Sequence, residues 1–96
     1  MYALRLTQLR SAPGQMQAVR QIYNAQIIPA IRATAGHHSS HLMEGVTDPD
    51  EAVGWIVWDE PVYAEAYVAT GAFAGHMALI RHLLAEEPVI KGYRSI

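Results

Sequence analysis

The chain has no cysteine among its 96 residues. Disulfide bonds therefore cannot supplement its core, and zinc or iron–sulfur sites built on cysteine are excluded. The seven Lys and Arg residues are scattered singly, and the net charge is −2. Because no basic patch can be read from this pattern, we expect neither nucleic acid nor a membrane surface as a partner.

Long hydrophobic runs are also absent. The longest apolar stretches cover only a few residues, such as Val53–Val57, which Gly54 interrupts. No segment is long enough to span a bilayer. The first ten residues alternate and lack the apolar centre of a signal peptide, so we expect a cytoplasmic protein.

The residues that are present indicate a folded chain, since 51% are hydrophobic and 17% are charged. A length of 96 residues suits a single domain spanning residues 1–96. A domain of this size buries only about 60–65% of the surface that its unfolded chain exposes. We therefore expect a partner subunit or a ligand to add to the buried surface.

The N-terminal half predicts a strand, a helix and a hairpin. Alternation over residues 2–10 predicts a strand with Leu4 and Leu6 on one face and Arg5 and Thr7 on the other. Helical spacing then runs from Gln15 to Ile31, on a stripe that includes Tyr23 and Ala30. Ser11 is expected to cap this helix, and Pro29 to kink or break it near Ile27–Ile28. Strands are expected over 37–46 and 52–58, joined by a turn at 47–50.

The C-terminal half predicts a broken helix and a last strand. Asp59 is expected to cap a helix that opens at Pro61. The pair Thr70-Gly71 interrupts it, and a second helical stretch continues as far as Leu84. Residues 89–96 read as the last strand.

The resulting order, β-α-β-β-α-β, predicts a ferredoxin-like α+β fold with an antiparallel four-stranded sheet and helices on one face. Nothing in the chain is left to cover the other face of the sheet. Trp55 or Trp58 exposed on a bare sheet would form a large apolar patch. We therefore expect a symmetric homodimer.

Several short features, spread over the whole chain, also resemble a known family. They are Pro13-Gly14, Ala35-Gly36, Asp48-Pro49, Trp58-Asp59-Glu60 with Tyr63 and Tyr67, Phe73 with His76, and the closing strand Val89–Tyr93. In these features the chain resembles the dimeric α+β barrel superfamily, most closely the antibiotic biosynthesis monooxygenase-like family. The resemblance implies two sheets packed back to back across a dimer, with a small-molecule pocket between each sheet and its own helices. Members include cofactor-independent oxygenases acting on aromatic polyketides, haem-degrading enzymes, and proteins of no known activity.

Two catalytic patterns of that family can be compared with this chain. The quinone-forming oxygenases use a Trp at the end of the third strand, an Asn four residues before it, and a Tyr in the following helix. Trp58 matches the Trp, Tyr63 lies near the Tyr position, and Gly54 stands where the Asn is expected. The haem-degrading members use an Asn, a Trp and a His, where this chain has Thr7, Tyr67 and, approximately, His76.

We predict His76 as a catalytic base, with Trp58 or Tyr67 as a hydrogen-bond donor to the substrate. The predicted substrate-binding residues are Arg5, Thr7, Tyr63, Phe73 and Met77. The alternative for His76 is a packed histidine bonded to the backbone, and for the aromatic residues it is core and dimer packing. Trp55 is expected in the core.

Arg5 has two interpretations. In a pocket it would hold a carboxylate or an enolate, whereas in a dimer interface it would need an acidic partner. The register of the first strand decides between them.

Three histidines suggest a metal cluster at first sight, namely His37, His38 and His41. On a strand, His37 and His38 point to opposite faces, and His37 and His41 lie about 13 Å apart. We therefore expect no metal and no cofactor, although an irregular segment would weaken this argument. His82 lies off the apolar stripe and is expected in solvent.

The sequence thus predicts a small homodimeric barrel that binds a small, partly aromatic organic molecule. If it is an enzyme, it is expected to be a cofactor-independent monooxygenase. The alternative is a non-catalytic ligand-binding or structural dimer, motivated by Gly54. A third interpretation, haem binding, depends on His76 alone.

Overall fold

Four antiparallel strands form one sheet in the computed structural model, which describes residues 1–96. The strand order is β2-β3-β1-β4. The strands are β1 (Ala3–Arg10), β2 (His37–Glu44), β3 (Glu51–Trp58) and β4 (Val89–Arg94). Strands β2 and β3 form the expected hairpin, and β4 pairs with β1 at an edge of the sheet. The predicted ferredoxin-like α+β fold is therefore confirmed.

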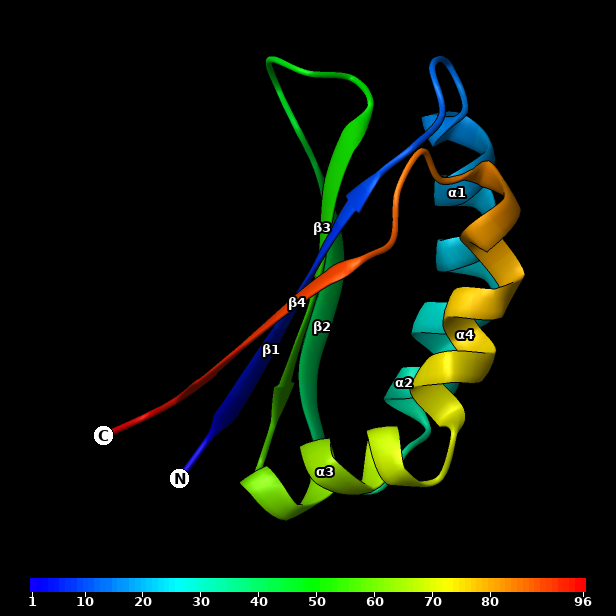
Figure 1. The fold of residues 1–96 in the computed structure, drawn as a ribbon. Coiled ribbons are helices and arrows are strands. Elements are labelled where there is room, and N and C mark those ends of the chain that lie inside the picture. Colours follow the sequence, from blue (N-terminus) through cyan, green and yellow to red (C-terminus); the bar gives the residue numbers. More distant parts are fainter.

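All the helices cover one face of this sheet (Figure 1). They are α1 (Met16–Ile22), η1 (Tyr23–Ile27), α2 (Ile28–Arg32), α3 (Pro61–Ala69), α4 (Ala72–Ile80) and η2 (Arg81–Leu83). Helices α1, α2 and α4 run along the sheet, while α3 crosses near one end of it, the end at which both chain termini lie. None of these helices has the length and apolar character needed to cross a bilayer.

The break expected near Ile27–Ile28 takes the form of a π-helical turn, η1, after which α2 restarts. Pro29, in the first turn of α2, has no N–H to offer to the regular helical ladder. The π turn holds one residue more than an α-helical turn. It therefore shifts the buried stripe by one position, so that Ile28 is buried and Ala30 is exposed. The expectation that Ala30 faces the sheet is wrong for this reason.

Neither predicted cap residue caps its helix. The Ser11 hydroxyl donates to Asp50 Oδ1 at 3.3 Å, and α1 begins after Gln15 without a side-chain cap. Asp59 Oδ1 lies 3.4 Å from His38 Nδ1 instead, and the cap position of α3 belongs to Glu60. Both predicted cap residues, Ser11 and Asp59, contact another side chain instead of the first turn of the helix, so both cap predictions are wrong.

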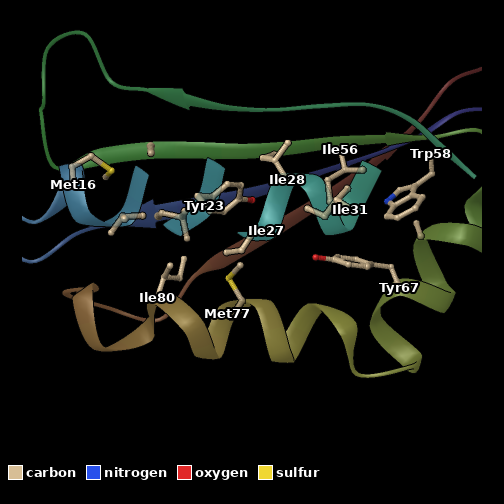
Figure 2. Packing of buried hydrophobic residues seen from close by; sticks show 14 of the residues in the cluster. Met16, Tyr23, Ile27, Ile28, Ile31, Ile56, Trp58, Tyr67, Met77 and Ile80 are labelled. Carbon is tan, nitrogen blue, oxygen red and sulfur yellow. The ribbon is translucent and has the colours of Figure 1, made fainter. Parts of the chain in front are cut away.

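The core lies between the helices and the sheet (Figure 2). It comprises Ala3, Leu9, Met16, Val19, Tyr23, Ile27, Ile28, Ile31, Ala52, Ile56, Trp58, Ala64, Tyr67, Met77 and Ile80. On β1 the residues that face the helices are Ala3, Arg5, Thr7 and Leu9, and Thr7 is buried with the core. Leu4 and Leu6 therefore lie on the opposite face of the sheet.

The two tryptophans of β3 lie on opposite faces. Trp58 is fully buried under the helices, whereas Trp55 is only half-buried and lies on the outer face with Val53 and Val57. The expectation that Trp55 belongs to the core is wrong, because three residues along a strand reverse the side-chain direction. In register, Trp55 lies beside His41 and Leu6. No element of the chain covers this outer face (Figure 1).

Candidate functional site

Four of the predicted site residues come together as a cluster of rings: Trp58, Tyr67, Phe73 and His76. The ring centroid of Tyr67 lies 5.3 Å from that of Trp58, 6.0 Å from Phe73 and 5.6 Å from His76. Trp58 ends β3, Tyr67 comes from α3, and Phe73 and His76 lie one turn apart on α4. Gly71, with φ of 85°, turns the chain sharply between α3 and α4. Tyr67 lies at the centre of this cluster, and the catalytic or binding role of its four members stays a prediction.

Tyr67 and His76 are joined by a hydrogen bond of 2.6 Å between the phenol oxygen and Nδ1. Burial lowers the pKa of His76 and raises the pKa of Tyr67, so both side chains are neutral at pH 7. In the tautomer that carries the proton on Nδ1, His76 donates to Tyr67 and leaves Nε2 free to accept a proton. In the other tautomer Tyr67 donates and Nε2 is a donor. The pair can therefore take up or deliver a proton at Nε2.

The indole nitrogen of Trp58 is buried and has no hydrogen-bond partner. A buried donor without a partner costs about 1–3 kcal/mol, and such groups are rare in folded proteins. Figure 2 shows Trp58 beside Tyr67 at one end of the core. This donor lies beside Tyr67, but because it is covered an acceptor atom could reach it only if the neighbouring rings shift.

Arg5 lies on the helix side of the sheet. It therefore faces the side of the predicted pocket and not the outer face, where a dimer interface is expected. It borders a cleft of about 450 Å³ between β1, β4 and α3. Ala3 and Glu65 border the same cleft. Ala3 pairs with Trp58 across the sheet, and Glu65 precedes Tyr67 by two residues on α3. The cleft therefore lies beside Trp58 through Ala3, although none of the four rings borders it.

The other predicted substrate-binding residues lie elsewhere. Tyr63 packs its ring against the backbone of Gly36 and takes part in none of the ring contacts around Tyr67. Met77 is 1% exposed and points from α4 toward Ile27 in the core (Figure 2). Thr7 is 6% exposed and faces the helices. Met77 and Thr7 thus lie within the packed layer, and a binding role for them and for Tyr63 stays a prediction.

Tyr23 lies on η1, and its sequence position predicts only a place in the apolar stripe of the first helix. A Cβ atom at Gly54 would overlap its hydroxyl, so the phenol sits directly on the bare backbone of β3. The hydroxyl forms no hydrogen bond to another residue, and burial raises the pKa of Tyr23 to about 12. Tyr23 therefore fills the space beside Gly54, where the family resemblance leads one to expect an amide. A glycine within an otherwise apolar strand often marks the close approach of another group, so Gly54 is the sequence feature that indicates this contact.

The three neighbouring histidines have separate partners. His37 Nε2 lies 2.9 Å from the Ser40 hydroxyl, His38 lies beside Asp59, and the His41 ring lies 5.4 Å from the Trp55 ring on the outer face. No three His, Asp or Glu side chains converge as a metal site requires. His82 is exposed, as expected.

Comparisons with known proteins give a likeness in structure alone. No protein-family model matches the chain, and neither does any curated protein. A Bordetella bronchiseptica structure, provisionally named an antibiotic biosynthesis monooxygenase, is 16% identical with a TM-score of 0.83, covering 99% of this chain and 97% of its own. A Deinococcus radiodurans structure with the same provisional name is 17% identical with a TM-score of 0.84, covering 97% and 91%.

A third structure carries no named activity. It is a conserved protein from Methanosarcina mazei, 16% identical with a TM-score of 0.84, covering 100% of this chain and 95% of its own. At such identities the likeness establishes the fold. The chain therefore has the same fold as these solved structures, two of which are provisionally named antibiotic biosynthesis monooxygenases, and this likeness supports the family resemblance that its sequence predicted.

Proposed function

We propose that this protein binds a small, partly aromatic molecule beside Tyr67 and His76 and oxidises it as a cofactor-independent monooxygenase. The observation that carries the proposal is the 2.6 Å contact between the Tyr67 hydroxyl and His76 Nδ1. Burial holds the pKa of His76 below its ordinary value, which keeps the ring neutral and able to accept a proton at pH 7. The shared fold with proteins provisionally named antibiotic biosynthesis monooxygenases supports the same function.

The chemistry needs a substrate that can reduce oxygen by itself, such as an anthrone. His76 Nε2 removes a proton from the acidic CH₂ group, and the resulting carbanion reacts with O₂. One oxygen atom becomes the new carbonyl group, and the other leaves as water with the two hydrogens of the CH₂ group. The Tyr67 hydroxyl, oriented by His76, donates a hydrogen bond to the substrate oxygen as negative charge develops there. Trp58 Nε1 can join it only if the neighbouring rings shift, because that atom is covered.

We also propose that two copies pack through their outer sheet faces, in the cytoplasm. Leu4, Leu6, Trp55 and Val57 lie on this face, which no element of the chain covers. Burying an apolar face of this kind is the usual driving force for a homodimer. The pocket of each copy then lies on the opposite side of its sheet.

The test is oxygen uptake with anthrone and hydroquinone-like substrates. We expect His76→Ala to lower the rate by about 100-fold, since general base catalysis contributes at least that much. Tyr67→Phe should lower it less, because it removes only a donor. His82→Ala is the matched control, since His82 is exposed on η2 and lies outside the cluster. Purified protein that consumes no oxygen above background would refute the proposal.

A non-catalytic ligand-binding or structural dimer is the second candidate. The position of Tyr23 over Gly54 favours it, because the amide of the quinone-forming pattern is absent there. In that case His76→Ala would change stability or ligand affinity and leave cellular activity intact. Haem fits less well: the Thr7 side chain is packed in the core, and only His76 of the haem-degrading pattern is present. Hemin addition without a saturable Soret change would exclude it.

A further inference from the structure

The guanidinium of Arg5 lies flat on a glycine of the neighbouring strand. Arg5 pairs with Gly92 in the register of β1 and β4. A Cβ atom at Gly92 would lie 3.1 Å from Arg5 Nη1 and 3.3 Å from both Cζ and Nε. Glycine inside a strand weakens it and often marks a close approach of another group. Gly92 therefore leaves the room in which the guanidinium rests.

No carboxylate neutralises this guanidinium. Its one hydrogen bond is from Nη1 to the Leu4 carbonyl oxygen, at 3.4 Å, and no acidic oxygen lies within 4.0 Å of it. Arg10, Arg20 and Arg81 each have such a partner. Arg5 is half-buried, and a half-buried cation without an anion is unfavourable for the folded chain alone. Such a cation is well suited to an anionic ligand.

The cleft beside Arg5 has the size and the charge for one small organic anion. Its volume, about 450 Å³, falls within the usual range of ligand pockets. Arg94 borders it with Arg5 and also has no acidic partner. One carboxylate, Glu65, lies on the opposite wall. Two positive charges against one negative charge favour a monoanion over a dianion.

We propose that this cleft binds the carboxylate of an aromatic monocarboxylic acid, with Arg5 as its principal anchor and Arg94 as a second cation. The planar guanidinium matches a carboxylate with two parallel hydrogen bonds. Because Ala3 borders the cleft and pairs with Trp58 across the sheet, the cleft lies beside one member of the ring cluster, and the aromatic part of the ligand extends in that direction. The inference rests on the proposed function and names the charge class of its substrate.

The test compares 1-naphthoate with its neutral counterpart 1-naphthamide, titrated into the ¹⁵N-labelled protein and followed by NMR, including the Arg Nε–H signals. We expect naphthoate to bind about tenfold more tightly, as one charge-assisted pair provides. Arg5→Gln should abolish this preference, and Glu65→Gln should strengthen naphthoate binding. Arg20→Gln is the matched control, because Arg20 is paired with Glu44 and does not border the cleft.

A second variant does not depend on removing the charge. Gly92→Val introduces a residue that favours strands, so the fold is retained, but its side chain displaces the Arg5 guanidinium. It should weaken naphthoate binding and leave naphthamide binding unchanged. Equal affinities for the two probes, or equal effects of Arg5→Gln and Arg20→Gln, would overturn the proposal. Preferential binding of naphthoate without oxygen uptake would support the carboxylate site and refute the proposed oxidation. Oxygen uptake without preferential binding of naphthoate would support the oxidation and refute the carboxylate site.

Discussion

Adding one methyl group at Gly54 should destabilise the protein through Tyr23 alone. A Cβ at this position would overlap the Tyr23 hydroxyl and lie 2.9 Å from its Cζ, whereas 3.4–4 Å is an ordinary contact. The phenol cannot swing away freely, because Tyr23 is 2% exposed and packed within the core. Overpacking of this kind costs about 1–3 kcal/mol, so we expect Gly54→Ala to lower the free energy of unfolding by about 2 kcal/mol.

Removing the hydroxyl should relieve most of that cost. Tyr23→Phe leaves Cζ as the nearest atom, at 2.9 Å, so a shift of the ring by about 0.5 Å restores an ordinary contact of 3.4 Å. The hydroxyl forms no hydrogen bond to another residue, so Tyr23→Phe alone should change stability by less than about 1 kcal/mol. Urea unfolding of the wild type, both single variants and the double variant, at one fixed protein concentration, gives the coupling energy between the two positions.

We expect a coupling energy of about 1–2 kcal/mol, in which Gly54→Ala is tolerated far better in the Tyr23→Phe variant than in the wild type. If Gly54→Ala costs the same in both backgrounds, to within about 0.5 kcal/mol, then the hydroxyl is not what occupies the space beside Gly54. That result would also remove the explanation for the glycine at this position in β3.

Three further results are expected. Because burial lowers the pKa of His76 in the folded state, the unfolded chain binds more protons than the folded chain below about pH 6.5. The free energy of unfolding, measured in urea, should therefore decrease as the pH is lowered below this value. His76→Gln should make this decrease smaller, and an unchanged dependence on pH would contradict the reasoning. Asp50→Ala removes the acceptor for the Ser11 hydroxyl and the Gly14 N–H and should lower the free energy of unfolding by about 1–2 kcal/mol, measured by the same assay. Trp55→Glu should convert the proposed homodimer into a monomer in light scattering, because it places a carboxylate on the outer sheet face, whereas Val68→Glu, on the exposed side of α3, should not.

The arrangement of strands and helices could be predicted because it follows from spacing along the chain. Alternation and helical periodicity are local properties, and they place β1 and β3 nearly at their observed bounds and α4 near its observed start, although α4 ends at Ile80 rather than at Leu84. The same spacing predicts that Phe73 and His76 share one face of α4, and both rings pack there against Tyr67.

What could not be predicted depends on contacts between distant segments. Asp50 lies far along the chain from Ser11, yet it decides that Ser11 is not a helix cap. The apolar character of Trp55 could not show which face of β3 it occupies, since both faces of that strand are apolar. The Tyr23 hydroxyl can occupy its position because Gly54 has no side chain. A single glycine does not change the hydrophobic periodicity of the sequence, so this contact could not be predicted from spacing.

The π turn at η1 makes the first helical segment unusual in how it tolerates a change of length. An extra residue in a helix normally rotates everything after it by about 100° and would turn the sheet-facing side chains toward solvent. Here a wider turn has taken up that residue, so Val19 before it and Ile31 after it both remain buried. Asn24, Ala25 and Gln26, inside the turn, are exposed. Deleting Ala25 should therefore close the turn into regular α-helix and leave both flanks facing the sheet, while the Tyr23 phenol loses the geometry that sets it on Gly54. This makes the turn a point where a one-residue deletion can reshape the interior without unfolding the helix.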